Sequence, residues 1–495
     1  MAPWYGPHYG VAAQGVLRGL GFLYILAFWS LASQIQALSG QGGLQPASAL
    51  YEFYLQQVGP NAPWLYPGLG WVSQSPVWMF VLCGCGVLGG LGLLYGFLPW
   101  GSGFVAWICW VSVLQLCQPW LSTPGDLLMS EVGLYSLFLV PVFCMKYPKA
   151  HHMASRLVGI FLLNLLAVRV FFTSGMAKLS EEAGSWVDST ALYHYFETQP
   201  LPTAGAWFFH QLPGGLLTYL LWGWMFIELM LPWYVFLPRI FRNMFAVALV
   251  VHSVVLLMVG QHGVMPLLSF LLALSLVDDV SWRRLLPLSW GPSASTQMFR
   301  PGIGGVLCLL ILVPCLLFHT VGGMKIRAPV PWKWVQEGLS RVYVGVTPPA
   351  DPEVQQQRVE IALHGSMDGE SWIEYPFWLK PTHPRSLAPV ASLHVSRLDL
   401  AFESYSRSNL VEEENVPLWM MHLLQGLLKG DARMVSLFPE NPFPDEPPTY
   451  LRLVLYNMNF ADPVTRREKN VWWERTPIQV LGPIFSLHTM PKQES

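Results

Sequence analysis

The chain has 495 residues, of which 53% are hydrophobic, 14% aromatic and only 12% charged, and its formal net charge is −2. The charged fraction is about half that of an ordinary soluble domain. This composition excludes an ordinary cytosolic enzyme, a disordered chain and a nucleic-acid-binding protein, since the last of these needs a basic surface.

The charged residues are unevenly distributed along the chain. Residues 1–320 contain 11 Lys and Arg and 10 Asp and Glu, whereas residues 321–495 contain 17 and 20. Because a bilayer excludes charge and water does not, this contrast predicts two domains. We expect a helical membrane domain over 1–320 and a soluble, extracytoplasmic, mostly β domain over 321–495.

Nine apolar runs in the first part have about the length needed to cross a bilayer. They are 20–38, 77–98, 103–120, 127–143, 157–177, 216–237, 244–260, 264–277 and 302–318. The eighth run is short, but residues 244–277 together exceed one crossing. A hairpin at Gln261, His262 and Gly263 is therefore predicted between the seventh and eighth spans.

Basic residues in the short loops predict the orientation of these spans, because such loops stay in the cytoplasm. With nine crossings, eight basic residues fall on the same side as Arg18, and the opposite loops contain only Lys178. The eight are Lys146, Lys149, Arg156, Arg239, Arg242, Arg283, Arg284 and Arg300. We therefore predict a cytoplasmic N-terminus and a periplasmic or lumenal domain 321–495.

Cysteine usage and glycosylation signals bear on the compartment. All seven cysteines lie in or beside apolar runs, and no Asn-x-Ser/Thr site occurs anywhere. These two observations favour a bacterial inner membrane over the endoplasmic reticulum. No Cys or His spacing suits a metal, and no phosphate-binding loop or lipase triad motif is found, so we expect no cofactor.

In the second part, 358–363 and 450–460 alternate in polarity as strands do, and 398–402 is a shorter strand candidate. Residues 416–429 have helical spacing and stop at Gly430. The segment 364–372 reads as a turn and resembles a turn of discoidin-like β-sandwich domains. The overall prediction is a polytopic α-helical membrane protein of about nine spans followed by a β-rich, β-sandwich-like soluble domain.

Five ionisable residues lie in or beside the predicted spans, where charge is costly unless it is paired or faces a wet cavity. They are Asp126, Glu131, Arg169, Lys178 and Glu228. Counting about 1.5 Å per residue from the span ends places Arg169 and Glu228 together at mid-membrane, and Lys178 near Glu131 at the outer surface. These residues form either a charge network that fixes helix packing or a site at the outer face.

Segments distributed over most of the chain resemble the lipase maturation factor family. They are 125–133 (GDLLMSEVG), 172–179 (FTSGMAKL), 190–192 (TAL), 197–202 (ETQPLP), 206–213 (AWFFHQLP), 227–232 (IELMLP), 277–279 (VDD), 365–375 (GSMDGESWIEY), 397–399 (RLD) and 441–450 (NPFPDEPPTY). The motif residues that we single out are Ser174, Gly175, Glu197, Gln199, Pro202, Trp207, His210, Pro232, Gly365, Ser366, Asp368, Gly369, Trp372, Arg397, Asp399 and Tyr450. The resemblance is specific because these segments follow one order over more than 300 residues.

The resemblance implies a multi-pass membrane protein whose outer domain helps secreted lipases to mature. Its expected partners are the lipid bilayer and a secreted lipase client, with no nucleic acid, and the aromatic clusters 332–334 and 472–475 are candidate contact surfaces. One alternative is a membrane-embedded enzyme that uses Lys178, Glu131 and Asp126. A weaker alternative is a transporter built around Arg169 and Glu228.

Fusions to the C-terminus test the predicted orientation. If 321–495 lies outside the cytoplasm, a C-terminal alkaline phosphatase fusion is active and a green fluorescent protein fusion is dark. Enzyme activity and fluorescence in intact cells are the two measurements. The reverse pattern contradicts the topology, and with it direct contact between this domain and a secreted lipase.

Overall fold

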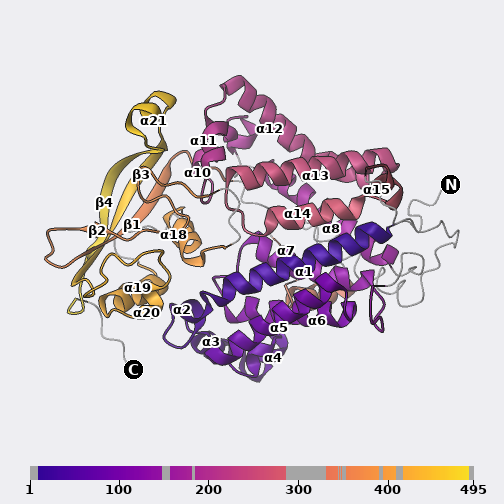
Figure 1. The fold of residues 1–495 in the computed structure, drawn as a ribbon, viewed down its shortest axis with the longest axis horizontal. Helices are drawn as coiled ribbons and strands as arrows, with labels where there is room; N and C mark the ends of the chain where they lie inside the picture. Colours follow the sequence, from indigo (N-terminus) through magenta and orange to yellow (C-terminus); the bar gives the residue numbers. More distant parts are fainter. Residues whose placement is uncertain are drawn as a thin grey trace.

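The computed structural model describes residues 9–147, 156–180, 184–285, 330–343, 345, 347, 353–389, 394–407 and 416–489. A helical body forms one end of the molecule and a sheet with its own helices forms the other (Figure 1). The longer helices of the body are α1 (Gly10–Ala32), α5 (Pro76–Tyr95), α6 (Pro99–Leu116), α7 (Pro124–Ser136), α8 (Arg156–Ala177), α12 (Gly214–Leu229), α13 (Arg239–Val259) and α14 (Met265–Leu276).

Shorter helices connect these or follow them. They are α2 (Ile35–Ser39), α3 (Ala47–Val58), α4 (Ala62–Leu65), α9 (Gly184–Val187), α10 (Ala191–Thr198), α11 (Ala204–His210), α15 (Asp279–Leu285) and α17 (Val330–Ser340). The C-terminal domain contains β1 (Arg358–Ser366), β2 (Ile373–Glu374), α18 (Arg397–Arg407), α19 (Leu418–Leu428), α20 (Ala432–Val435), β3 (Tyr450–Phe460), α21 (Pro463–Lys469) and β4 (Trp473–Phe485).

Five helices within the described ranges are long and apolar enough to cross a membrane, namely α1, α5, α6, α8 and α13. The pair α11 and α12, bent by 115°, passes the same test as one broken span. The predicted runs 127–143 and 264–277 form α7 and α14, whose 13 and 12 residues are too few to cross alone. The predicted run 302–318 lies outside the described residues. A membrane body is thus confirmed, whereas helix length supports at most six of the eight crossings predicted within the described part.

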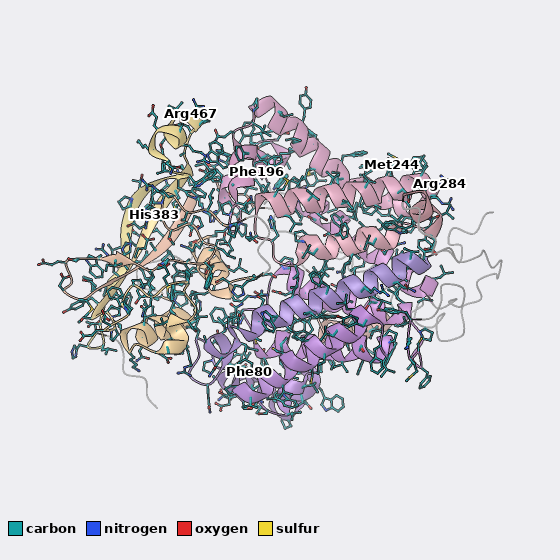
Figure 2. All side chains as sticks on the ribbon, viewed as in Figure 1. Phe80, Phe196, Met244, Arg284, His383 and Arg467 are labelled. Atoms are coloured by element: carbon teal, nitrogen blue, oxygen red, sulfur yellow. The ribbon has the colours of Figure 1, made fainter. Side chains whose placement is uncertain are left out.

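Small residues let the helices of the body approach closely. At the crossing of α1 and α5, a Cβ on Gly21 would lie 2.6 Å from the Gly90 carbonyl oxygen, and one on Gly90 would lie 2.7 Å from the Gly21 carbonyl oxygen. Glycine at both positions permits a backbone contact that any side chain would block, as in other membrane helix pairs. Outward-facing apolar side chains such as Phe80 cover the flank of α5 (Figure 2).

The sheet of the C-terminal domain is antiparallel throughout, in the order β2-β1-β3-β4. β1 pairs with β3 from Arg358 opposite Met458 to Ser366 opposite Tyr450. One face of the sheet packs against α18 and α19, which bury Phe402 and Leu424 beside Ile361. This confirms the strands predicted at 358–363 and 450–460 and the helix predicted at 416–429. The described residues contain one sheet and not the two that a sandwich requires.

The strand predicted at 398–402 is wrong, because these residues belong to helix α18. Ser396 donates a hydrogen bond to the Asp399 carboxylate at 2.5 Å, and its hydroxyl accepts one from the Asp399 N–H at 3.3 Å. This reciprocal cap starts a helix. Leu398, Phe402 and Ser406, spaced four residues apart, then form its buried face.

The C-terminal domain rests on the loops at one end of the membrane body. The Gln34 side-chain amide donates to the Val395 carbonyl at 2.8 Å, His422 bonds to the Leu44 carbonyl at 2.8 Å, and Thr203 forms a bridge with Ala388. The loops in contact are those predicted to lie opposite the basic loops. Arg284 lies at the far end of the body, and His383 lies in the domain (Figure 2).

A buried charge cluster anchors β1 to this end of the body. The Arg358 guanidinium donates to the carbonyl oxygens of Glu197 and Gln199 at 2.9 and 2.8 Å and pairs with Glu360. Lys380 completes the cluster, with its Nζ 2.8 Å from the Glu360 carboxylate. Burial by itself would raise the pKa of Glu360, but the charges and hydrogen bonds of Lys380 and Arg358 hold it below its ordinary value.

This cluster predicts a pH-dependent stability. Because the pKa of Glu360 is lower in the folded chain, its contribution to the free energy of unfolding is present above its ordinary value and is lost as the pH falls through the folded value. Glu360→Gln should therefore lower the melting temperature at pH 7, by an amount that corresponds to about 3–5 kcal/mol for a broken buried pair. The difference from the natural protein should narrow below about pH 4.

Thermal melting of the purified full chain between pH 7 and pH 2 checks this. Glu468→Gln is the control, because Glu468 is exposed on α21 and the same change there should have little effect at any pH. A Glu360→Gln deficit that stays constant over the whole range would contradict the assignment.

Candidate functional site

A cavity of about 270 Å³ lies at the seam between the membrane body and the C-terminal domain. Its wall on the membrane side comes from α8, α12, α13, α14 and the loops beside them, and its other wall includes Glu353, Val395, Leu400 and Arg407. The membrane-side wall includes the charged residues Lys178, Glu228 and Asp126. The cavity is therefore the candidate functional site.

An ion pair between Lys178 and Glu228 forms part of the membrane-side wall. The Lys178 Nζ lies 2.5 Å from Glu228 Oε2 and donates to the Ser174 hydroxyl at 3.0 Å. The Trp224 indole N–H donates to the other Glu228 oxygen at 2.8 Å. The ammonium also lies 5.0 Å from the centre of the Trp186 ring, a favourable cation–π position. Both charged side chains are almost completely buried.

Local sequence explains how the pair forms. Ser174 and Lys178 are four residues apart, so they lie on one face at the C-terminal end of α8, where a cation is favoured. Gly175 brings α12 close, because a Cβ there would lie 2.9 Å from Leu229 and 3.1 Å from Glu228. The motif residues Ser174 and Gly175 thus hold Lys178 against α12.

The ion pairs differ from those predicted by counting residues. Arg169 pairs with Glu131 at 2.5 Å, and Lys178 pairs with Glu228, so the predicted partners are exchanged. The prediction assumed one continuous helix over 216–237. α12 instead ends at Leu229, which puts Glu228 in its last turn and not at mid-span. Glu131 also accepts a hydrogen bond from Thr347 at 2.5 Å.

Asp126 joins the two domains. Its carboxylate oxygens accept two hydrogen bonds from the Arg397 guanidinium, at 2.6 and 2.8 Å. The same carboxylate accepts from the backbone N–H of Thr123, and the Thr123 hydroxyl accepts from the Asp126 N–H, which forms a capping box at the start of α7. Both charged side chains are buried. A paired, two-point contact of this kind is strong and directional.

Several other motif residues support the seam. The Glu197 carboxylate accepts the Phe460 N–H, and the Trp207 indole donates to the Ala461 carbonyl at 2.7 Å. Burial raises the pKa of Glu197, although the Phe460 N–H and Arg358 oppose this. Pro202 forms a bridge with Gly260, and Pro232 is buried in the turn after α12.

The partly buried His210 and the fully buried Asp399 lie outside the cavity wall. The His210 ring is 5.4 Å from the Phe460 ring. Asp399 accepts the N–H groups of Leu379 and Lys380 at 2.5 and 3.0 Å, yet burial raises its pKa. Asp399 thus holds the loop at Leu379 and Lys380 against the start of α18.

The motif residues from Gly365 to Trp372 form the β1–β2 turn, away from the cavity wall. Asp368 accepts the N–H groups of Glu370 and Ser371 at 2.8 Å and bonds to the Ser366 hydroxyl, and these hydrogen bonds lower its pKa. Gly369 adopts a left-handed conformation with φ of 78° that favours glycine. Tyr450 lies beside this glycine, and Arg452 covers the Trp372 ring.

The structure thus brings Asp126, Ser174, Lys178, Gln199, Glu228 and Arg397 to one cavity. It adds His252, His262, Trp186 and Trp224, which sequence reasoning did not select for this site. His252 was recognisable as a polar residue inside an apolar run, whereas the two tryptophans gave no signal. In the predicted contact cluster 472–475, Trp473 is a core residue that stacks on Phe460 with ring centres 4.3 Å apart.

Comparison with known proteins gives the following. Residues 11–284 match the family described as lipase maturation factor transmembrane domain, and residues 350–483 match the lipase maturation factor C-terminal domain. Lipase maturation factor 2 of Xenopus tropicalis is 32% identical, over 96% of this chain and 82% of its own length. Lipase maturation factor 1 of Mus musculus is 26% identical, over 95% and 86%, and that of Homo sapiens 24%, over 96% and 88%. No solved structure shows a significant match.

Replacement of Lys178 tests the buried pair. Lys178→Met leaves Glu228 charged and unpaired in the cavity wall, so it should lower the free energy of unfolding by about 3–5 kcal/mol. The double variant Lys178→Met with Glu228→Gln removes both charges and should recover part of that loss. The measurement is the thermal melting temperature of the purified protein in detergent.

Arg239→Met is the matched control, since Arg239 also pairs with a carboxylate, that of Asp278, but has a side chain that is 44% exposed. Its loss should cost no more than about 1 kcal/mol. If the double variant melts no higher than Lys178→Met alone, the two charges are not coupled and the pairing is wrong.

Proposed function

The chain belongs to the lipase maturation factor family, and from this premise we propose that it is a membrane-anchored maturation factor that helps secreted lipases reach an active folded state. Both family domains are present, in the same order and over most of the chain. The relatives named above carry this function in their names, and the chain aligns with more than four fifths of their length.

The observation that carries the proposal is the firm docking of the C-terminal domain on one end of the membrane body. The contact between Asp126 and Arg397 fixes α18 to the start of α7, and Arg358 fixes β1 to the loop after α10. A client that contacts this domain is therefore held at a constant position relative to the membrane. A maturation factor needs such a platform more than it needs a reacting group.

The membrane side of this platform is part of the proposal. The protein is a multi-pass membrane protein. We place the C-terminal domain outside the cytoplasm, because the loops that it contacts are poor in Lys and Arg. This side is the periplasm for a bacterial inner membrane and the lumen for the endoplasmic reticulum. The relatives named above are animal proteins, so the bacterial preference stays a prediction.

The charge arrangement favours this function over the two alternatives. A transporter built on a midplane pair of Arg169 and Glu228 lacks its central contact, since each residue bonds elsewhere. For an enzyme, Lys178 would need to face a substrate, but its Nζ is already bound by the Glu228 carboxylate and the Ser174 hydroxyl. Glu131 and Asp126 are likewise held in ion pairs. These groups are arranged to fix packing.

The docking contact gives the test. Arg397→Gln leaves Asp126 buried without its cation, so the C-terminal domain should lose its fixed position. Secreted lipase activity should then fall severalfold at equal expression of the maturation factor. The host cells are ones in which deletion of this protein abolishes lipase secretion and a plasmid copy restores it. The measurement is the rate at which their culture medium hydrolyses triolein.

Arg407→Gln is the matched control, because Arg407 is on the same helix but its ion pair with Glu403 stays within α18. It removes an equal charge without touching the docking contact, and lipase activity should be retained. Equal losses in the two variants, or full activity of Arg397→Gln, would contradict the platform.

A further inference from the structure

The seam cavity has features that a docking platform does not require. It is an internal space of about 270 Å³, close to the lower end of the usual size of small-molecule sites. Two domains build it, which is a common location for such sites. Exposed Glu353 is part of its wall, so the cavity reaches the surface there.

Each lysine and arginine of the wall is paired with a carboxylate. Lys178 is matched by Glu228, Arg397 by Asp126, and Arg407 by Glu403. A ligand with a net charge would enter this space without a free counter-charge and would lose its hydration. The wall therefore favours a molecule whose head group is neutral.

Two buried side chains present polar atoms to the cavity without hydrogen-bond partners in the described part of the chain. His252 is 9% exposed and neither of its ring nitrogens is hydrogen-bonded, its Nε2 lying 3.7 Å from Glu228. Gln199 is 2% exposed and its side-chain oxygen has no donor. Buried polar groups are nearly always satisfied, so these atoms indicate a partner that carries hydroxyl or carbonyl groups.

Much of the rest of the wall is apolar and aromatic. Phe171 and Trp224 flank His252 with ring centres 5.4 and 5.2 Å from its own, and Leu256 lies one turn further along α13. Val170 and Leu400 extend this surface on the two sides of the seam. Such a wall accepts hydrocarbon, so the ligand has an apolar body as well as a polar head.

We propose that the seam cavity binds one molecule of a neutral amphipathic lipid, with a head of hydroxyl and ester groups at His252 and Gln199 and an acyl chain along Phe171, Trp224 and Leu256. Acylglycerols have this chemistry. The helices α8, α12 and α13 that build the wall belong to the membrane body, so the bilayer is a direct source of such a lipid. This site is independent of the lipase client.

Equilibrium binding of tritiated 1-decanoylglycerol to the purified full chain in detergent tests the proposal. We expect saturable binding of one molecule per chain. Leu256→Trp fills the cavity and should weaken binding about tenfold or more, which corresponds to 1.4 kcal/mol. Val254→Trp is the matched control: it puts the same side chain on the opposite, 48% exposed face of α13 and should change binding less than twofold.

Two further ligands test the head group. Decanoate has the same chain length but a negative charge, and we expect it to bind at least tenfold more weakly at neutral pH. Glycerol alone should not bind. His252→Phe keeps the ring but removes its nitrogens, so it should weaken decanoylglycerol binding several-fold while the chain still folds.

Three results of the binding measurements would contradict the proposal. Absence of saturable binding, equal effects of Leu256→Trp and Val254→Trp, or decanoate binding as tight as that of decanoylglycerol would each overturn the proposal. If Leu256→Trp lowers the melting temperature strongly, Leu400→Trp fills the cavity from the C-terminal domain instead, where the residue is only partly buried. Solvent extraction of protein from native membranes, followed by mass spectrometry, identifies the natural ligand. A monoacylglycerol at about one molecule per chain supports the proposal, and a charged lipid at that level contradicts it.

Discussion

The Asp126 carboxylate is the group on which the arrangement of the two domains depends. It starts helix α7 through its capping box with Thr123, and it binds the Arg397 guanidinium from the other domain. Both charged groups lose their hydration when they form this contact. The contact is therefore favourable only if its geometry is good and neither charge is left without its partner. A single carboxylate thus sets where a membrane helix begins and where the outer domain rests.

Hydrophobic patterning predicted most of the fold, because it reports burial directly. The long apolar runs locate α5, α6, α8 and α13, and alternation locates β1 and β3. It failed at 398–402, because five residues fit the periodicity of a strand and that of a helix equally well. The hydrogen bonds of Ser396 at the start of α18 favour the helix there. It also overestimated α7, since apolar composition continues to residue 143, past the end of the helix at Ser136, and it counted the 12-residue α14 as a crossing.

The residues of the cavity were predicted individually but not as partners. Charges in apolar runs are rare enough to select Lys178 and Glu228 from the sequence. Their pairing depends on where α12 ends and on the contact that Gly175 permits between α8 and α12, and neither follows from counting residues. The contact between Asp126 and Arg397 joins positions 271 residues apart, so only the folded chain reveals it.

The seam also determines the order in which the chain can assemble. Arg358 and Arg397 find their partners at Glu197, Gln199 and Asp126, all of which leave the ribosome much earlier. The membrane body must therefore be inserted before the outer domain can satisfy its own buried arginines. Expressed by itself, that domain would carry Arg397 without its counter-charge, Arg358 without its two carbonyl acceptors and an open apolar surface. We therefore do not expect it to be stable apart from the membrane body.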